Sequence, residues 1–212
     1  MPKQALVVKR DVLFNGSYFQ GFMPKGQTDF IPIILSKFEY YERGEKLEND
    51  PSLQQIIPYI WIVNPKAKKV FAYKRSVKGY SESRLMNKWS CGIGGHIDKE
   101  DSKDPIQNGM MRELKEEVKI KEYPQPKIIG FINDDSDVVN QVHFGVVAVA
   151  ETDFDVEKND EEISEGRLYT LKDLEKIFSD PQNDVEKWTK ISWPVVKAYA
   201  LCLFEKEKVV SL

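Results

Sequence analysis

The sequence has few cysteines, no long hydrophobic run and no secretory leader pattern. Cys91 and Cys202 are its two cysteines, far apart and without the spacing of metal ligands, so neither a disulfide framework nor a zinc site is expected. The longest apolar stretch, around residues 144–150, is too short to span a bilayer, and the start of the chain lacks a charged-then-apolar leader. We therefore expect a cytoplasmic protein without a membrane partner.

The sequence also lacks an excess of positive charge. Lys and Arg total 31 and Asp and Glu total 34, which gives a formal net charge of −3. A chain of this charge does not attract nucleic acid through a general positive field, so no nucleic-acid partner is expected. A phosphate-containing substrate must instead be bound by a local cluster of suitable groups in a binding site.

What is present is the composition of a globular protein, 41% hydrophobic and 31% charged over 212 residues. This length predicts one domain with a sizeable addition. Residues 39–55 are polar and acidic and end near Pro51. We place a boundary there, between an N-terminal extension (1–50) and a main domain (51–212). The aromatic-rich extension is expected either to cover the sheet or to form an oligomer interface, with a homodimer as the simplest assembly.

The pattern of apolar residues and turn signals predicts several strands and helices. In the extension, 5–14 reads as a strand, and 30–35 as an edge strand or irregular segment because of Pro32. In the main domain we expect a hairpin (56–63 and 70–75), strands (127–132, 142–150 and 167–170), an acidic loop (153–165), a helix capped by Thr170 (171–178) and a C-terminal helix interrupted near Pro194 (184–205).

A further helix is predicted from about Pro105 to Ile120. Asp104 can cap it, and proline is favoured at the first helical position. An apolar stripe follows at helical spacing, as in a helix that packs on a sheet; its members are Ile106, Met110, Leu114 and Val118.

Three acids of this helix lie along one edge next to the apolar stripe. Glu113 and Glu117 are four residues apart, and Glu116 is one turn from Glu113. Like charges at this spacing cost about 0.2–0.5 kcal/mol, so a positive group should neutralise them. Clustered carboxylate oxygens suit Mg²⁺ or Mn²⁺, which bridge to substrate phosphates. The alternative is a solvated charged face balanced by Lys115 and Lys119.

The sequence context of this helix favours the metal site. Gly95 is followed by eight residues, Asp104, seven more residues and then Arg112-Glu113-Leu114-Lys115-Glu116-Glu117. This resembles the Nudix box, G-x5-E-x7-R-E-U-x-E-E-x-G-U with U aliphatic, and in particular the MutT-like phosphoesterases that carry Gly-Ile-Gly-Gly-His-Ile. The first spacer is longer than in the motif, and Asp104 stands at the first Glu, where it is either a catalytic group or only a helix cap. Lys119 replaces the last Gly, so the helix end is expected to shift.

The resemblance implies an α/β fold, an α/β/α sandwich around a mixed sheet. It implies that Glu113, Glu116 and Glu117 ligate Mg²⁺ or Mn²⁺ together with a carbonyl of Gly95, and that Glu116, Glu117 and Arg112 are catalytic. A later acidic loop supplies a further carboxylate in many members, for which Glu162 and Glu165 are the candidates here. Other candidates for contact with substrate are Arg75, Arg84, Lys88, Gly94 and His96.

The implied function is metal-dependent hydrolysis of a pyrophosphate linkage in a nucleoside diphosphate derivative, such as a nucleoside triphosphate or nucleotide sugar. Two alternatives remain at this point. The altered first half of the box also fits a module that binds or senses a nucleotide without turnover. A diphosphate isomerase with a similar fold would use a cysteine, here Cys91, but the intact Arg-Glu-Leu-x-Glu-Glu run favours hydrolysis.

Overall fold

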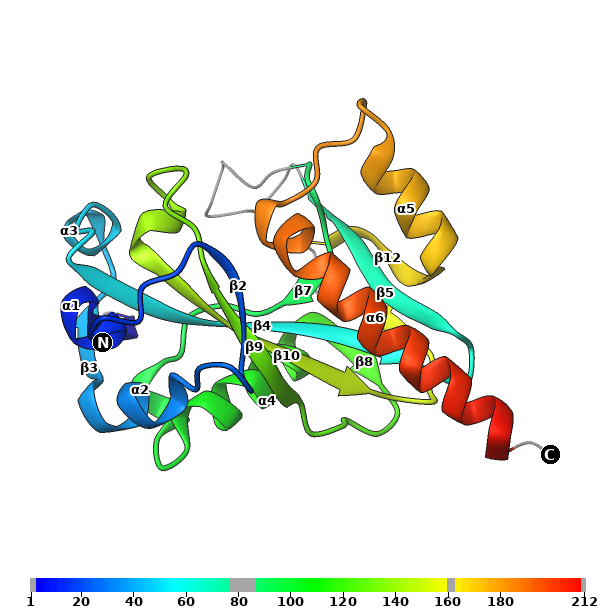
Figure 1. Cartoon of the computed structure of the whole chain (residues 1–212), viewed down its shortest axis with the longest axis horizontal. Helices are drawn as coiled ribbons and strands as arrows, with labels where there is room; N and C mark the ends of the chain where they lie inside the picture. Colours follow the sequence, from blue (N-terminus) through cyan, green and yellow to red (C-terminus); the bar gives the residue numbers. More distant parts are fainter. Residues whose placement is uncertain (1–2, 77–86, 160–162, 211–212) are drawn as a thin grey trace. The chain divides into compact units, whose positions relative to one another are not determined.

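The computed structural model describes residues 3–76, 87–159 and 163–210. The chain divides into two compact units, and most of their helices and strands are labelled in Figure 1. Unit 1 comprises Met1–Tyr59, Gly94–Arg112 and Lys127–Ala148; unit 2 comprises Ile60–Ile93, Glu113–Pro126 and Val149–Leu212. Three elements contribute residues to both units: β4 (Leu53–Asn64), α4 (Pro105–Glu117) and β10 (His143–Glu151).

Unit 1 is built on antiparallel strands. β1 (Gln4–Lys9) pairs with β3 (Glu39–Glu42) and with β4, and β2 (Gly21–Pro24) pairs with β9 (Lys127–Asn133). Its short helices are α1 (Arg10–Phe14), α2 (Ile31–Lys37), α3 (Glu45–Glu48), and the 3₁₀ turns Lys99–Asp101 and Asn140–Val142. The N-terminal 50 residues therefore share a unit with the segment after the glycine cluster and with β9.

An aromatic cluster fills the core of unit 1. Phe14, Phe19 and Phe30 from the N-terminal segment are all buried. They pack on one another and on Phe144, and Phe30 also packs on Phe131, with ring centroids 5.2–6.2 Å apart. Edge-to-face contacts of this kind add to the stabilisation from apolar burial. These three phenylalanines cover the sheet inside the unit, so they do not offer an exposed surface to a second copy.

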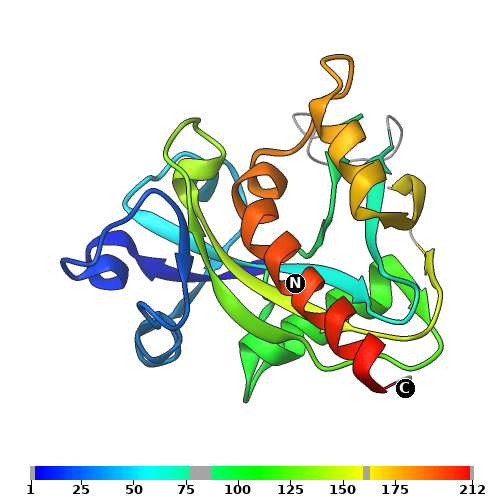
Figure 2. The same ribbon diagram turned by 45° about the vertical axis from the view of Figure 1, so that its right-hand side comes forward.

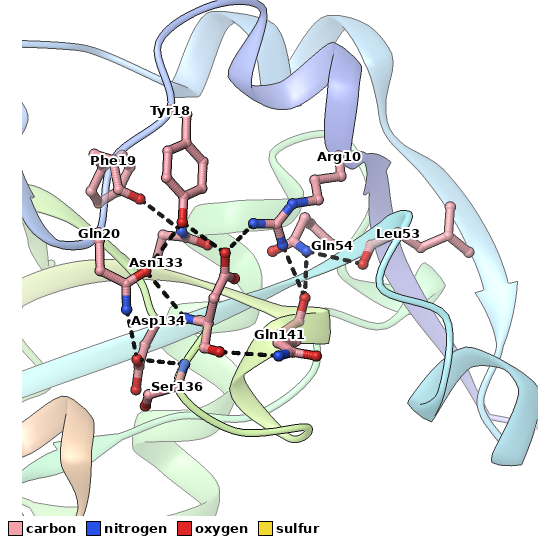
Figure 3. Close-up of polar contacts among 11 residues, drawn as sticks. Arg10, Tyr18, Phe19, Gln20, Leu53, Gln54, Asn133, Asp134, Ser136 and Gln141 are labelled. Atoms are coloured by element: carbon pink, nitrogen blue, oxygen red, sulfur yellow. Dashed lines mark hydrogen bonds and ion pairs between the residues drawn. The ribbon is translucent and has the colours of Figure 1, made fainter.

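A polar network attaches the N-terminal segment to the loop after β9, as Figure 3 shows. The Arg10 guanidinium lies 2.5 Å from a carboxylate oxygen of Asp135, which also accepts a hydrogen bond from the Tyr18 hydroxyl at 2.7 Å. That hydrogen bond is the main cause that raises the pKa of Tyr18. Gln20 donates to Asp134 at 2.9 Å. The network holds the turn that leads into β10.

Unit 2 contains a second set of antiparallel strands and two further helices. β5 (Lys69–Arg75) pairs with β4, with β6 (Trp89–Ser90) and with β12 (Ile163–Thr170), and β7 (Gly92–Ile93) pairs with β4. β8 (Val118–Ile120) pairs with β11 (Val156–Lys158). Figure 2 shows α5 (Leu171–Ser179) and the long helix α6 (Lys187–Val210). No helix in the described part of the chain is long and apolar enough to cross a membrane.

Several local predictions are confirmed. β4 and β5 form the expected hairpin, with Val63 opposite Val70. The Thr170 hydroxyl accepts from the Asp173 amide at 3.2 Å and caps α5.

Other predictions of secondary structure are wrong. Residues 10–14 form α1, which ends at Asn15 in the left-handed conformation, and not the second half of a strand. Residues 31–37 form α2, because Pro32 lies in the first turn, where no amide donor is needed, and the Asp29 carboxylate accepts from the Ile31 amide at 3.0 Å. α6 continues through Pro194, which lies on the exposed side of the helix, where solvent can satisfy the unpaired carbonyl one turn earlier. The expected acidic loop contains β11 and the start of β12.

A tyrosine of α6 predicts how stability changes in alkali. The Tyr199 hydroxyl donates to Glu151 at 2.7 Å, and burial followed by this bond raises the pKa of Tyr199 to about 12. An unfolded tyrosine ionises near pH 10, so this contribution is complete below that pH and is lost as the pH rises towards 12. We expect Tyr199→Phe to lower the free energy of unfolding by less than about 1 kcal/mol at pH 7. Between pH 10 and 12, the free energy of unfolding measured in urea should fall less steeply for the variant than for the wild type. Equal alkaline slopes for variant and wild type would contradict this.

Candidate functional site

The glycine cluster ends in a close backbone contact within unit 1. A Cβ atom at Gly94 would lie 1.8 Å from the carbonyl oxygen of Pro58, a distance at which no side chain fits. The contact brings the chain against β4 directly before Gly95 and His96. The sequence needs glycine at position 94 for this approach.

Arg112, which precedes the three glutamates of α4, forms a bidentate ion pair with Asp101. Its Nε donates to one carboxylate oxygen at 3.1 Å and its Nη2 to the other at 3.0 Å. The same Nη2 donates to the carbonyl oxygen of His96 at 2.8 Å. Asp101 is buried and also accepts from the Asp98 amide at 2.9 Å. Arg112 thus joins helix α4 to the loop after the glycines.

The sequence interpretation missed Asp101 and placed Asp104 at the first acid of the box. In the structure Asp104 is exposed and caps α4, since it accepts from the Gln107 amide at 3.4 Å. Spacing offered a signal that was overlooked. Five residues separate Gly95 from Asp101, as in the motif, whereas ten separate Asp101 from Arg112. The extra residues therefore lie after the first acid, in the turn that leads into α4.

This assignment predicts different costs for two conservative substitutions. Asp101→Asn removes a buried charge from its pair with Arg112, and we expect a loss of about 2 kcal/mol in the free energy of unfolding at pH 7. Asp104→Asn is the matched control, because asparagine caps a helix as well as aspartate does, and it should cost less than about 0.5 kcal/mol. Urea denaturation of both variants measures the difference. A larger loss for Asp104→Asn would contradict the pairing.

His96 is held at its side chain as well as at its carbonyl. Its Nε2 lies 2.8 Å from Oε1 of Gln55, a buried residue of β4. Burial is the main cause that lowers the pKa of His96 well below its usual value, and nearby basic groups act in the same direction: Arg43, His143, Arg112 and Lys3. The imidazole is therefore neutral at pH 7.

The three glutamates of α4 belong to unit 2 and differ in exposure. Glu113 is buried, Glu117 is half-buried and Glu116 is exposed. Their spacing places all three on adjacent turns of one helix. The apolar stripe is confirmed in the buried side chains of Ile106, Met110 and Leu114.

The helix ends at Glu117, earlier than the sequence predicts. The amide of Asn159 donates to the Glu117 carbonyl at 2.8 Å, and its side chain donates to the Glu116 carbonyl at 3.1 Å. Residues 118–120 then form β8, where Lys119 pairs with Glu157. Pairing with β11 and capping by Asn159 end the helix, so no glycine is required.

The residues of this helix fit a hard divalent cation by their chemistry. Three carboxylates supply oxygen donors only, which Mg²⁺ and Mn²⁺ prefer. The buried position of Glu113 makes a nearby positive charge favourable, because a buried carboxylate is costly without one.

The basic residues expected at the substrate form ion pairs in unit 2. Arg75 is buried, lies over the Tyr73 ring, and has Nη2 3.9 Å from Glu186. Lys88 lies 3.5 Å from Asp184. Glu165, a candidate extra carboxylate, accepts from the Tyr169 hydroxyl at 2.7 Å. Arg84 and Glu162 lie outside the described residues.

Cys91 lies in the interior of unit 2, and its amide donates to the Thr189 hydroxyl at 3.2 Å. Burial, and then the charge of Glu186, raise the pKa of the Cys91 thiol well above its usual value. A protonated, buried thiol is a poor nucleophile and a poor acid.

Comparison with known proteins places these features in a family. The sequence profile of the NUDIX domain matches residues 54–189. Protein YmaB of Bacillus subtilis (strain 168) is 31% identical over 202 residues, which cover 90% of this chain and 95% of YmaB. The crystal structure of Tm1382 matches with a TM-score of 0.75 at 28% identity, over 91% of this chain and 97% of Tm1382. The NUDIX hydrolase from Alicyclobacillus acidocaldarius shares the fold with a TM-score of 0.51 at 12% identity, over 71% and 92% of the two chains. The predicted α/β fold is confirmed.

Proposed function

This chain belongs to the Nudix family of hydrolases that act on pyrophosphate bonds, and from that premise we propose that it is a Mg²⁺-dependent enzyme that cleaves a nucleoside diphosphate derivative. One observation carries the proposal: helix α4 ends in Arg-Glu-Leu-x-Glu-Glu, with its three glutamates on adjacent turns. Mn²⁺ has the same donor preference and is the expected substitute.

In this proposal Glu113, Glu116 and Glu117 hold the cation together with the carbonyl of Gly95. When bound, such an ion would activate a water and neutralise charge on the phosphoryl oxygens. Glu116 and Glu117 orient the attacking water through their carboxylate oxygens. Arg112 acts as a positioning residue, because its bonds to Asp101 and to the His96 carbonyl hold the glycine loop.

The phosphate chain of the substrate then needs positive or dipolar partners. The amides of Gly94 and Gly95 follow β7 and can donate to phosphate oxygens. Arg75 and Lys88 are proposed to assist, although each already has an acidic neighbour in unit 2. The substrate class is a nucleoside triphosphate, a nucleotide sugar or a related compound, because the motif recognises the pyrophosphate and other loops recognise the rest.

Two other functions make different predictions. A nucleotide-sensing module would bind without turnover, and the longer turn between Asp101 and Arg112 is the feature that favours it. A diphosphate isomerase would need a reactive cysteine, whereas Cys91 is buried and its thiol pKa is raised, which speaks against that reaction.

The test is a substrate screen of the full chain with Mg²⁺, with products identified by mass spectrometry. The proposal expects at least one nucleoside diphosphate derivative to be split at its pyrophosphate, and chelation to stop the reaction. Saturable nucleotide binding without any product would support the sensing module instead. Mass-neutral rearrangement of a diphosphate would support the isomerase.

A further inference from the structure

Three side chains of types that ligate metal ions converge in unit 1. Glu48 ends helix α3, His96 follows the glycine loop, and His143 begins β10. One ligand atom from each lies within 4.8 Å of the other two, and all three side chains are half-buried. Among the described residues no other three His, Cys, Asp or Glu side chains approach one another this closely, and this includes the three glutamates of α4. Segments separated by nearly 50 residues supply the three groups.

The imidazole of His143 is oriented by a backbone carbonyl. Its Nδ1 lies 2.6 Å from the carbonyl oxygen of Val139, which can only accept a hydrogen bond. Nδ1 therefore carries the proton and Nε2 carries the lone pair, as in most histidines that ligate metals. The turn before His143 is held in place, since the Gln54 side chain donates to the Gln141 carbonyl at 2.7 Å (Figure 3).

Gln55 orients the other two groups. Its amide nitrogen lies 3.5 Å from a carboxylate oxygen of Glu48, and its amide oxygen lies 2.8 Å from Nε2 of His96. Because a carboxylate only accepts, the amide nitrogen faces Glu48 and the amide oxygen faces His96. His96 must then donate from Nε2, which leaves the lone pair on Nδ1. One buried amide thus sets both the carboxylate and the second imidazole.

The backbone around His96 is also fixed. Arg112 donates to its carbonyl at 2.8 Å, and the Leu6 amide donates to the next carbonyl, that of Ile97, at 2.9 Å. Binding of an ion would therefore require little ordering of the loop, which is the main cost of forming such a site.

We propose that Glu48, His96 and His143 form a binding site for a divalent transition-metal ion of the zinc class, with water as the fourth ligand. Two imidazoles and one carboxylate are a donor set that zinc accepts, whereas Mg²⁺ and Ca²⁺ prefer oxygen alone. Zinc bonds of about 2.0–2.2 Å place tetrahedral ligands roughly 3.4 Å apart, so ligand atoms that now lie within 4.8 Å of one another need to approach by up to about 1.4 Å. The ion would join α3, the glycine loop and β10 within unit 1.

The charges around the site set its expected strength. Lys3, Arg43 and Arg112 lie close enough to act on His96, and of these Arg112 is paired with Asp101. Glu48 supplies the one negative charge among the ligands. We therefore expect micromolar affinity and not the tighter binding of a site with several anionic ligands.

The composition makes this proposal easy to test, because the chain has two histidines and both are in the site. Any sign of imidazole ligation reports on this cluster alone. No zinc site was expected from the sequence, because the two cysteines lack the spacing of metal ligands. That spacing does not bear on the present site, which contains no cysteine. The site shares no residue with the three glutamates of α4, and its test measures zinc binding, which does not depend on the proposed hydrolysis.

The experiment uses the full chain without a histidine tag, stripped with a chelator and titrated with Zn²⁺ by calorimetry and by NMR of the histidine rings. We expect one imidazole-ligated equivalent, shifts of both ring signals and a raised melting temperature. Glu48→Gln should weaken binding at least tenfold, and His143→Gln should remove it. Glu45→Gln, an exposed acid on the same short helix, is the matched control and should leave affinity unchanged. Glu117→Gln should also retain this binding.

Two results would overturn the proposal. One is that saturating Zn²⁺ leaves the histidine ring signals of the folded wild type unmoved, which means that zinc binds elsewhere or not at all. The other is that Glu48→Gln, shown to be folded by circular dichroism, binds zinc as tightly as Glu45→Gln.

Discussion

Glu117→Gln is expected to lower kcat for Mg²⁺-dependent pyrophosphate cleavage by about a hundredfold to a thousandfold. Glutamine keeps the size of the side chain but removes its charge, so the half-buried end of α4 should stay folded while its affinity for the cation falls. The loss should be partly recovered at high Mg²⁺ if the carboxylate is a ligand. Activity is measured on the best substrate of the screen across a range of Mg²⁺ concentrations.

The matched control is Glu122→Gln, which removes the same charge from an exposed position just after β8. It should keep kcat and KM within about twofold, since a surface charge outside the site has little effect on the transition state. A Glu117→Gln enzyme as active as Glu122→Gln would remove Glu117 from the metal site. Inactivity of the wild type itself would instead count against hydrolysis.

Gly94→Ala is expected to destabilise the protein by about 3 kcal/mol or more. The added Cβ would lie 1.8 Å from the Pro58 carbonyl oxygen and 2.7 Å from its carbonyl carbon, so the backbone of β4 or of the loop must move. Such a clash cannot be relieved by a side-chain rotation, because both partners are main chain. Urea unfolding monitored by circular dichroism gives the change in free energy.

Gly26→Ala provides the comparison for this effect. No atom lies within 4 Å of the Cβ position at Gly26, and its backbone does not require glycine, so the substitution should change stability by less than about 0.5 kcal/mol. If Gly94→Ala were as mild as Gly26→Ala, the close contact with Pro58 would be wrong. A folded Gly94→Ala protein with impaired hydrolysis would additionally show that the loop position matters for the reaction.

Features that depend on neighbours in sequence could be predicted well. The capping residues Asp104 and Thr170 act within one turn of their helices. The β4–β5 hairpin is predicted by the turn-forming residues between its two strands. The acids of α4 and its apolar stripe follow from helical periodicity alone. These interactions are local, so residue type and spacing are enough to state them.

Features that depend on partners far along the chain could not be predicted from the sequence. Residues 10–14 look like a continuing strand, but Arg10 pairs with Asp135 and the segment turns into α1. The end of α4 was placed too late because its capping residue, Asn159, is more than 40 positions away. Nothing in the local pattern distinguishes such residues from ordinary polar ones.

The sequence by itself determined the family motif, the helix that carries three glutamates, and the residues that begin that helix, because all of these are set by spacing along one segment. Only the tertiary structure decided that Asp101 is the partner of Arg112, that Cys91 is buried, and that Glu48, His96 and His143 meet. The reason is physical: burial and long-range hydrogen bonds arise when β-pairing brings distant segments together, and a single sequence does not encode that register locally.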